Sequence, residues 1–419
     1  MRHRSLPVAC AAVVALAFAA QRAPAADDAK PDATAAPFEL KDGDTVVLLG
    51  NTLIERAQRY GYVETALTTQ WPGRRITFRN LGWSGDTVWA ESWAGFDFDN
   101  PAKGYQRLVE HVRALKPTVI VLGYGGNESF AGAAGVSRFG QQLAKLVDDL
   151  KPTGARFVIL SPNFYEPIVP AAGDGRKRIE QISLYAQALR DFAGEHGFAF
   201  VDLFATSDPT RQLAPLTDDG MHLTSYGYYE AAFHVLRELG WPAAQLEVDL
   251  TADGKVTRAQ GAAVTGAKAG AGVLRFQMTA DRLPPPPAPP GTHFVRTTAV
   301  LSVAGLPAGR YDLKSGGRMI VAASAGDWAR GVWLHRGPDA EQAEHLRHAV
   351  LKKNELYFHR WRPQNITYLF LFRKHEQGQN AKEIPEFDPL VEVQETLIAK
   401  LRAPVSHEYE MVKTEGGAK

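Results

Sequence analysis

The chain has almost no cysteine. Among its 419 residues only Cys10 carries a thiol, and it lies in an N-terminal stretch that we expect to be removed. The remaining chain has no cysteine. It can therefore form no disulfide, hold no metal through cysteine ligands and use no cysteine nucleophile. Its stability must then come from buried apolar surface, which a chain of this length can supply.

The chain also lacks an excess of charge of either sign. Lys and Arg number 47 against 46 for Asp and Glu, a net charge of +1. Proteins that bind nucleic acids or other polyanions typically have a clear basic excess. The composition therefore indicates no nucleic-acid partner. The hydrophobic share of 45% and the charged share of 22% are typical of globular proteins.

No apolar run in the chain is long enough to span a membrane. A basic start at residues 2–4 precedes the apolar stretch Pro7–Ala20, and small residues follow at 23–25. This arrangement is typical of a secretory signal peptide, whereas a membrane anchor needs about 20 apolar residues. We therefore expect residues 1–25 to be a signal peptide and the protein to be exported, periplasmic or extracellular, with no transmembrane segment in the mature chain.

Short apolar runs alternate with helix patterns through the first half of the chain. The expected strands are Thr45–Leu49, Arg75–Leu81, Thr118–Leu122, Arg156–Leu160 and Ala199–Leu203, and the expected helices are Leu53–Thr69, Tyr105–Leu115, Val136–Leu150, Arg176–His196 and Tyr226–Leu239. Such alternation predicts a doubly wound α/β domain with a parallel sheet. We place this domain at residues 44–243, after a flexible lead-in at 26–43.

The pattern changes after residue 243. Residues 244–330 are rich in Gly, Ala, Val and Pro and show strand-like alternation, which predicts a smaller β-rich module. Residues 331–419 predict a C-terminal helical segment, with helices at Ala340–Asn354 and Phe387–Leu401 and a last stretch without regular structure. Between these helices, the aromatic and polar cluster Phe358–Asn365 either lines a cleft against the α/β domain or forms an interface with it.

Asp219 and His222 lie three residues apart in an Asp-Gly-x-His loop that runs into the last helix of the α/β domain. A carboxylate this close to an imidazole can hold one ring nitrogen. The other nitrogen is then free to take a proton from a hydroxyl group or a water molecule. The pair is therefore a candidate for general base catalysis.

Three further polar loops follow predicted strands. Thr52 follows the first strand, Gly85 the second and Asn127 the third. In open parallel sheets, ligands collect at the carboxyl ends of the strands, so we expect these residues and the Asp219–His222 loop to form one site.

The order and placement of these four loops resemble the four blocks of the SGNH/GDSL hydrolases over residues 44–240. The resemblance implies a flavodoxin-like fold and ester hydrolysis. By matching position, it implies an oxyanion N–H at Gly85, an oxyanion amide at Asn127 and the Asp-x-x-His pair at Asp219 and His222. Glu128 stands where the family more often has Asp.

The first block departs from the family pattern. The family has Gly-Asp-Ser, whereas this chain has Gly-Asn-Thr at residues 50–52, which places Thr52 at the nucleophile position. The methyl group of threonine stiffens the side chain and crowds an attack. Thr52 and Glu55 also match a Thr-x-x-Glu capping box, which would use the hydroxyl to cap the following helix.

Other residues leave alternatives open. Glu55 or Glu91 would serve as another acid or base beside His222. The tryptophans Trp83, Trp89 and Trp93 either present a sugar-stacking face or are packed inside the protein. The histidines suggest no metal-ligand set, so we expect neither a metal nor another cofactor.

Two main hypotheses follow from the sequence. The first is an exported hydrolase that removes acyl groups, such as acetyl, from a carbohydrate, with a small-molecule or polysaccharide ester as its substrate. The second is a catalytically impaired relative that binds a glycan or a protein partner. A third is a structural module of a larger exported assembly. The sequence does not indicate the oligomeric state.

Overall fold

The computed structural model describes most of the chain after residue 36. The chain divides into two units, Met1–Ala35 and Ala36–Lys419, and the described residues all belong to the second. They are 37–95, 97, 99–167, 175–205, 214–241, 245–292, 298–376 and 380–414. The expected signal peptide and most of the expected lead-in therefore lie outside the described residues.

Five parallel strands form the sheet that the alternating pattern predicts. Their order is β2-β1-β3-β4-β5, and all neighbouring pairs are parallel. The strands are β1 (Thr45–Gly50), β2 (Thr77–Asn80), β3 (Val119–Gly123), β4 (Arg156–Leu160) and β5 (Ala199–Val201). This is the strand order of a flavodoxin-like doubly wound sheet, and it confirms the predicted fold class.

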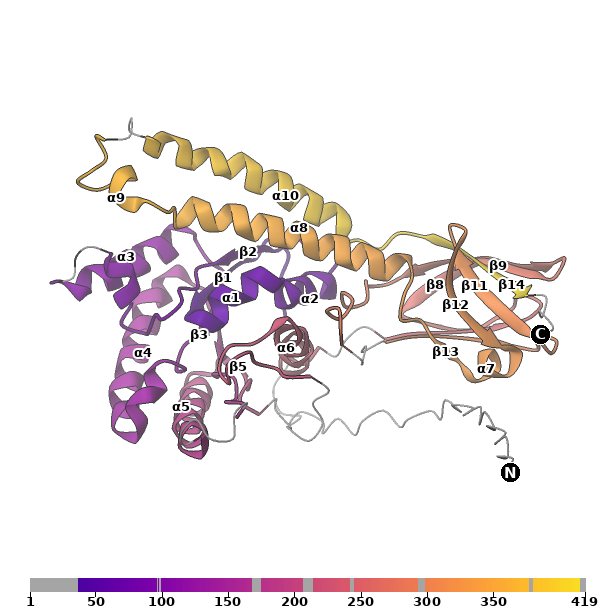
Figure 1. The fold of residues 1–419 in the computed structure, drawn as a ribbon, viewed down its shortest axis with the longest axis horizontal. Helices are drawn as coiled ribbons and strands as arrows, with labels where there is room; N and C mark the ends of the chain where they lie inside the picture. The colour runs from indigo at the N-terminus through magenta and orange to yellow at the C-terminus, as the bar shows by residue number, and fades with distance from the viewer. Residues whose placement is uncertain are drawn as a thin grey trace, which may run out of the picture. The chain divides into compact units, whose positions relative to one another are not determined.

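Alternate residues of β1 belong to two hydrophobic cores, one on each face of the sheet. Val46 and Leu48 pack with one set of helices, whereas Val47 and Leu49 pack with the other. Both faces are therefore covered, and a strand buried on both faces reads as a continuous apolar run. The first set is α1 (Thr52–Tyr60), α2 (Tyr62–Gln70) and α6 (Ser225–Glu238); the second is α3 (Pro101–Ala114), α4 (Val136–Leu150) and α5 (Gly175–His196), as labelled in Figure 1.

The prediction of one helix over Leu53–Thr69 is wrong, because Gly61 divides it into α1 and α2. Gly61 has a φ of 68°, and its N–H donates to the carbonyl of Ala57, which ends α1. Glycine adopts this left-handed conformation without the steric cost of a Cβ atom. A Cβ at Gly61 would also lie 3.1 Å from the side chain of Leu351, so the break lets a later helix pack closely here.

Two further sheets confirm the β-rich module. Their strand orders are β13-β10-β6-β7 and β12-β11-β14-β9-β8, and they share a core that includes Phe276, Leu301 and the fully buried Trp328. The strands are β6 (Leu246–Thr251), β7 (Val256–Gln260), β8 (Ala262–Gly270), β9 (Val273–Ala280), β10 (Ala299–Ala304), β11 (Arg310–Ser315), β12 (Arg318–Ser324), β13 (Val332–Trp333) and β14 (His407–Thr414).

The end of the chain returns to this module, although we predict no regular structure there. β14 pairs antiparallel with both β9 and β11. Its alternate residues Tyr409 and Met411 point into the core of the module and are 2% and 1% exposed. The last strand therefore lies between two strands that come much earlier in the sequence.

Both predicted C-terminal helices are present, one with the expected bounds Phe387–Leu401 and the other longer than expected. The helices are α7 (Ala325–Arg330), α8 (Pro338–Trp361), α9 (Ile366–Leu369) and α10 (Phe387–Leu401). α8 and α10 lie side by side (Figure 1) and share a small core of Leu346, Val350 and Ile398. α8 extends beyond the predicted Ala340–Asn354 into the aromatic cluster, which brings that cluster within reach of the α/β domain.

A buried ion pair fastens α8 to the α/β domain. Lys353 on α8 is fully buried, and its Nζ lies 2.7 Å from Oε1 of Glu64 on α2. The same ammonium donates to the carbonyl of Phe78 on β2 at 3.1 Å, and the amide of Asn354 donates to Glu64 at 2.8 Å. A buried carboxylate needs such partners because leaving water is costly for a charge.

We expect Lys353→Met to lower the free energy of unfolding by about 3–5 kcal/mol, because Glu64 would remain buried without its cation. Adding Glu64→Gln should recover much of this loss, since no uncompensated charge is left. Lys352→Met is the matched control, because Lys352 pairs with the exposed Glu355, and its effect should stay within about 0.5 kcal/mol. Urea unfolding followed by circular dichroism measures these values, and a Lys353→Met variant of wild-type stability would contradict the expectation.

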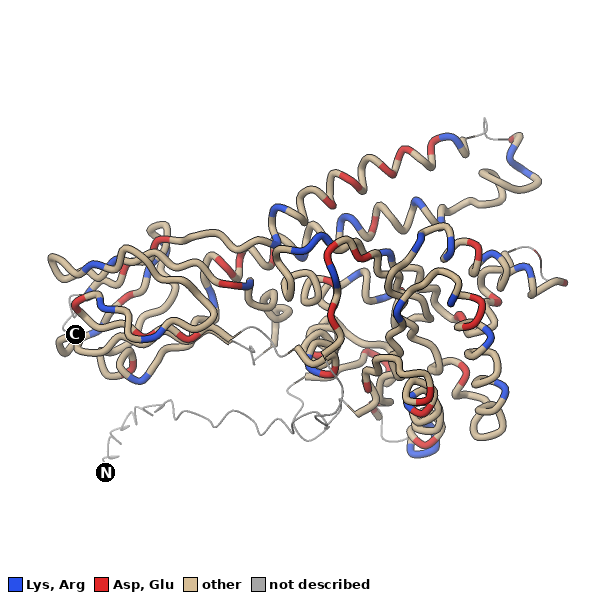
Figure 2. Tube along the Cα trace, turned by 180° about the vertical axis from the view of Figure 1, so that it is seen from behind, with Lys and Arg blue, Asp and Glu red and all other residues tan. Residues whose placement is uncertain are grey.

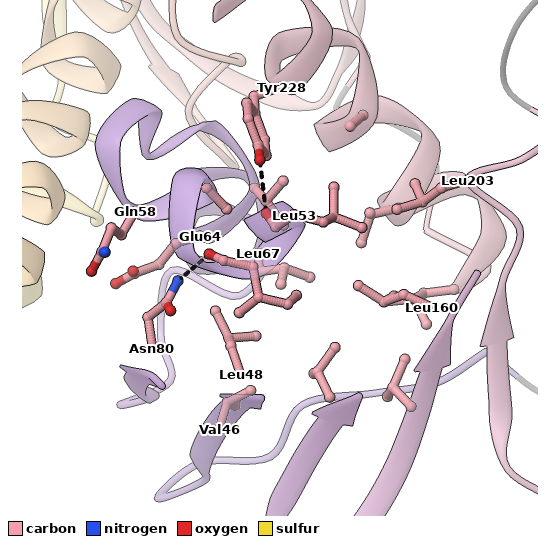
Figure 3. A pocket seen from close by; sticks show the side chains of 18 of the residues that line it. Val46, Leu48, Leu53, Gln58, Glu64, Leu67, Asn80, Leu160, Leu203 and Tyr228 are labelled. Atoms are coloured by element: carbon pink, nitrogen blue, oxygen red, sulfur yellow. Dashed lines mark hydrogen bonds between the residues drawn. The ribbon is translucent and has the colours of Figure 1, made fainter. Parts of the chain in front are cut away.

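An apolar cavity of about 60 Å³ lies between the sheet and helices α1, α2 and α6 (Figure 3). Its walls include Leu53 and Leu223, which directly follow Thr52 and His222 in the sequence. The hydroxyl of Tyr228 donates to the carbonyl of Leu53 at 2.7 Å. Neither Thr52 nor His222 lines the cavity, so it belongs to the core behind the predicted site.

Basic and acidic residues are interspersed along the described chain (Figure 2). The mixture agrees with the balanced composition. Among the helices of the described ranges, none has an apolar stretch long enough to cross a bilayer.

Candidate functional site

The predicted site residues follow the carboxyl ends of neighbouring strands. Thr52 comes after β1, Gly85 after β2 and Asn127 after β3. Asp219 and His222 lie in the connection between β5 and α6. Since β1 lies between β2 and β3, the first three loops meet at the edge of the sheet where open α/β folds bind ligands.

The hydroxyl of Thr52 does not cap its own helix. The N-cap of α1 is Asn51, whose Oδ1 accepts the N–H of Leu53 at 3.1 Å. The predicted capping box of Thr52 and Glu55 is therefore wrong, because Thr52 is already inside the first turn. Its Oγ1 instead accepts the N–H of Gly85 at 3.2 Å, which brings the first and second loops into direct contact.

Gly85 is held in a conformation that favours glycine. Its φ is 82°, in the left-handed region, although a Cβ atom there would meet nothing within 4 Å. The requirement for glycine therefore comes from the backbone conformation rather than from crowding. This conformation directs the Gly85 N–H at the Thr52 hydroxyl.

Asn127 reaches the same loop from β3. Its Nδ2 donates to the carbonyl of Asp86, the residue after Gly85, at 2.8 Å. The side-chain amide nitrogen carries two N–H groups, so one remains to donate a hydrogen bond to an oxygen of a ligand. The structure therefore brings Thr52, Gly85 and Asn127 together as predicted.

The side chain of Glu128 joins the second and third loops. Its buried carboxylate accepts the N–H of Val88 through Oε1 and the N–H of Gly125 through Oε2, each at 2.8 Å. Burial raises the pKa of Glu128 to about 7, against the opposing effect of these N–H donors. The sequence identifies this residue only as a departure from the family's Asp, whereas the structure shows it as the clamp between the loops.

Asp86, in the second loop, is another buried carboxyl group. We expect its ionisation to lower the free energy of unfolding at high pH. Burial raises its pKa to about 7, although Ser92 donates a backbone N–H to it, whereas an unfolded Asp titrates near about 4. Between these values the folded protein binds more protons than the unfolded chain, so the stability contribution of Asp86 falls as pH rises through this window.

Asp86→Asn should therefore be about 2–4 kcal/mol more stable than wild type at pH 8 and close to wild type near pH 4. Urea unfolding at pH 4.5, 6 and 8 measures the difference. Asp388→Asn removes an exposed carboxylate and should leave the pH dependence of wild type unchanged. An Asp86→Asn variant with the wild-type pH slope would contradict the assignment.

Asp219 and His222 form the predicted pair. Nδ1 of His222 lies 2.5 Å from Oδ2 of Asp219. The other oxygen of Asp219 accepts the backbone N–H groups of His222 at 2.9 Å and Met221 at 3.0 Å. Partial burial opposes ionisation, but the backbone and ring donors outweigh it and lower the pKa of Asp219 to about 2. The carboxylate is thus ionised at neutral pH and fixes the ring through Nδ1, which leaves Nε2 to accept a proton.

A segment that the sequence pattern does not identify holds this loop. Asn163 follows β4 and donates to the carbonyl of Met221 at 2.9 Å. Glu166 accepts the N–H and the hydroxyl of Thr217 at 2.8 and 2.7 Å, and its own N–H donates to Gly220 at 2.9 Å. In the sequence, this segment could have been identified by its polar residues, which follow the fourth strand at the same edge of the sheet as the other loops.

Arg56 links the fourth loop to α1. Its Nη2 lies 2.6 Å from Oδ2 of Asp218, the residue before Asp219. Arg56 is one helical turn after Thr52 and therefore lies on the same side of α1. This ion pair ties the Asp219–His222 loop to the helix that carries the candidate nucleophile.

The carboxylates considered as alternative acids or bases have other partners. Oε2 of Glu55 accepts the N–H of Ser84 at 2.7 Å and lies 2.8 Å from Nη1 of Arg362. Glu91 accepts a short hydrogen bond from the hydroxyl of Thr87. Both act in holding the second loop.

The tryptophans near the second loop are packed against protein groups. Trp93 is buried and stacks on Trp361, with ring centroids 5.1 Å apart. The guanidinium of Arg362 lies 4.1 Å from the ring centroid of Trp83, and that of Arg138 lies 4.8 Å from the ring of Trp89. Of the two sequence alternatives, these contacts favour packing over a sugar-stacking face.

One group of possible metal ligands lies within the described ranges. It consists of Asp218, Asp219 and His222. Asp218 is neutralised by Arg56, and Asp219 is bonded to the imidazole ring and two backbone N–H groups. A metal ion would have to displace these partners. The three residues are therefore better suited to acid–base chemistry than to binding a metal.

Residues 49–229 match the model of the GDSL-like lipase/acylhydrolase family. The match spans all of the predicted site residues and confirms the resemblance seen in the sequence. No curated protein matches the chain significantly.

Several solved structures are similar to this chain. A gut microbial diltiazem-metabolizing enzyme is 19% identical with a TM-score of 0.69, and the similarity covers 90% of this chain and 99% of that one. The common fold therefore extends beyond the α/β domain into the β-rich module and the C-terminal helices. An acetylxylan esterase from Geobacillus stearothermophilus is 21% identical with a TM-score of 0.39 and covers 49% of this chain and 97% of its own. An alpha/beta hydrolase from the metagenome of Lake Arreo, Spain, is 21% identical with a TM-score of 0.36 and covers 48% and 97%.

Proposed function

We propose that this chain, with its GDSL-like lipase/acylhydrolase domain, hydrolyses esters by using Thr52 as the nucleophile. His222 takes the proton of the Thr52 hydroxyl, and Asp219 orients and stabilises the imidazolium that forms. The N–H of Gly85 and the amide of Asn127 donate to the oxyanion. The position of these residues in loops that follow strands of the parallel sheet supports these roles.

The observation that carries this proposal is the hydrogen bond from the Gly85 N–H to Oγ1 of Thr52 at 3.2 Å. It directs the hydroxyl into the site rather than toward the N-terminus of α1. When the oxygen attacks an ester carbonyl, the same N–H is close enough to donate to the carbonyl oxygen as its charge develops. The hydroxyl and the oxyanion donor are therefore already adjacent before a substrate binds.

Two covalent steps complete the reaction. Oγ1 forms a bond to the carbonyl carbon while its proton moves to Nε2 of His222, and the alcohol then leaves with that proton. A water molecule attacks the resulting acyl-threonine, gives its proton to His222, and the acid leaves as Thr52 regains its proton. No redox partner is needed.

The substrate that we propose is a carbohydrate ester, and we propose that the protein is exported. The side chains of Asp219 and His222 are 52% and 35% exposed, so an ester carried on a large polar molecule can reach them. The basic and apolar N-terminal stretch supports export. The solved neighbour that metabolises diltiazem adds a small-molecule candidate to the substrates worth testing.

The decisive experiment compares acid release from 4-nitrophenyl acetate, acetylated xylan and diltiazem by the protein without residues 1–25. Ester hydrolysis that is lost in both Thr52→Ala and His222→Ala supports the proposal. Hydrolysis lost only in His222→Ala would replace Thr52 by an activated water molecule. If the wild type is inactive and Thr52→Ser gains activity, the threonine marks a hydrolase-derived binding protein.

A further inference from the structure

Successive backbone N–H groups of the second loop each donate a hydrogen bond. The N–H of Gly82 donates to Oδ1 of Asn80 at 2.9 Å, and the N–H of Trp83 donates to the carbonyl of Gly50 at 2.9 Å. The N–H of Ser84 donates to Oε2 of Glu55 at 2.7 Å, one residue before Gly85. The direction of the Gly85 N–H therefore depends on the place of the Glu55 carboxylate.

This loop also lies directly on α1. A Cβ atom at Gly82 would come within 2.2 Å of the backbone nitrogen of Glu55, so only glycine permits this approach. Glu55 therefore touches the loop through its backbone and its carboxylate. A shift of its side chain would be passed to the Ser84–Gly85 peptide.

The cation that compensates Glu55 comes from outside the α/β domain. The side chain of Glu55 is 6% exposed, and Nη1 of Arg362, at the end of α8, lies 2.8 Å from its Oε2. Within the described residues, the only other cation that pairs with Glu55 is Arg59, which is 65% exposed and 3.9 Å away. An exposed cation at that distance contributes little, so Arg362 is the main partner of the buried charge.

Arg362 is itself held in place by aromatic rings. Its guanidinium lies 4.1 Å from the ring centroid of Trp83, which belongs to the loop, and 5.0 Å from that of Phe358. The neighbouring Trp361 stacks on Trp93 with ring centroids 5.1 Å apart. A planar guanidinium can stack and donate at once, which the ammonium of lysine cannot.

We propose that Arg362 is a positioning residue for the oxyanion loop, so that the C-terminal helical segment orients the catalytic Gly85 N–H. Arg362 fixes Glu55, Glu55 fixes the Ser84 N–H, and the stacked Trp83 ring fixes the other side of the same loop. The catalytic part of this inference rests on the proposed ester hydrolysis. Its structural part, the ordering of residues 83–86 by Arg362, can be measured without turnover.

The test combines kinetics with amide hydrogen exchange of the full mature chain. Arg362→Ala should lower kcat about tenfold or more, because a small misplacement of a catalytic donor is costly. KM should stay within about twofold, since the donor acts mainly on the transition state. Exchange should become faster in residues 83–86 and remain unchanged in β1 and β3. Arg362→Lys should restore part of kcat by supplying the charge without the planar stack.

Arg360→Ala is the matched control. Arg360 lies in the last turn of α8, two residues before Arg362, and pairs with the exposed Asp388 at 2.8 Å. This variant therefore removes the same charge away from the loop and should leave kcat and exchange unchanged. Wild-type kcat and wild-type exchange in Arg362→Ala would overturn the inference. Faster exchange throughout the α/β domain would also overturn it, because the role would then be general stability. If the wild type hydrolyses no ester, the proposed function fails, and the exchange of residues 83–86 alone decides the role of Arg362.

Discussion

Replacing His222 by alanine is expected to lower kcat for ester hydrolysis by about two to four orders of magnitude, which is the usual contribution of a general base. Nδ1 of His222 is engaged by Asp219 at 2.5 Å, so Nε2 is the ring atom left to take the proton. KM should change little, because the proton transfer belongs to the transition state. Asp219→Asn should lower kcat in the same direction, since an amide cannot stabilise the imidazolium as a carboxylate does.

Initial rates with 4-nitrophenyl acetate measure this effect. His348→Ala is the matched control, because His348 is 61% exposed on α8 and contacts Glu344 at 3.2 Å. It should keep the wild-type kcat. A His222→Ala variant with more than about a tenth of the wild-type kcat would show that another group acts as the base.

Removing the hydroxyl in Thr52→Ala is expected to lower kcat by about three orders of magnitude or more, because the covalent route is lost with the nucleophile. Thr52→Ser should instead raise kcat severalfold. Serine keeps the oxygen that accepts the Gly85 N–H but lacks the methyl group that restricts the side chain and crowds the attack.

The two substitutions at Thr52 should therefore act in opposite directions. Thr257→Ala, in the β-rich module, removes the same atoms from a residue whose hydroxyl donates to the Asp249 carbonyl at 3.1 Å, and it should have no effect on kcat. Rates for all four proteins on one chromogenic acetate make the comparison. Equal activity of wild type and Thr52→Ala would exclude Thr52 as the nucleophile.

The α/β fold could be predicted from the sequence because its signals are local. Strands such as Thr118–Leu122 are buried on both faces and read as continuous apolar runs, and the predicted helix Val136–Leu150 coincides with α4. The break at Gly61 was missed because an isolated glycine within a helix pattern does not reveal a left-handed backbone. β14 was missed because its pairing partners are distant in sequence, and a lone alternating stretch does not identify them.

The site could be predicted in part for the same reason. Asp219 and His222 are three residues apart, so their contact follows from local spacing. The role of the Thr52 hydroxyl could not be predicted, because Thr-x-x-Glu also fits a capping box and only the structure shows Asn51 taking that place. The contact of Glu55 with Arg362 joins residues that are 307 positions apart in the sequence, and no spacing rule predicts it.

The proposed mechanism depends most on Thr52 acting as a covalent nucleophile, and an alkyl fluorophosphonate tests this directly. Its phosphorus should bond to Oγ1 of Thr52 as fluoride leaves and His222 takes the proton. Mass spectrometry of digested wild-type protein should locate one adduct on the peptide that contains Thr52, with none in Thr52→Ala and much slower formation in His222→Ala. A wild-type protein that hydrolyses esters but has no adduct at Thr52, or has the adduct on another residue, would contradict the proposed mechanism.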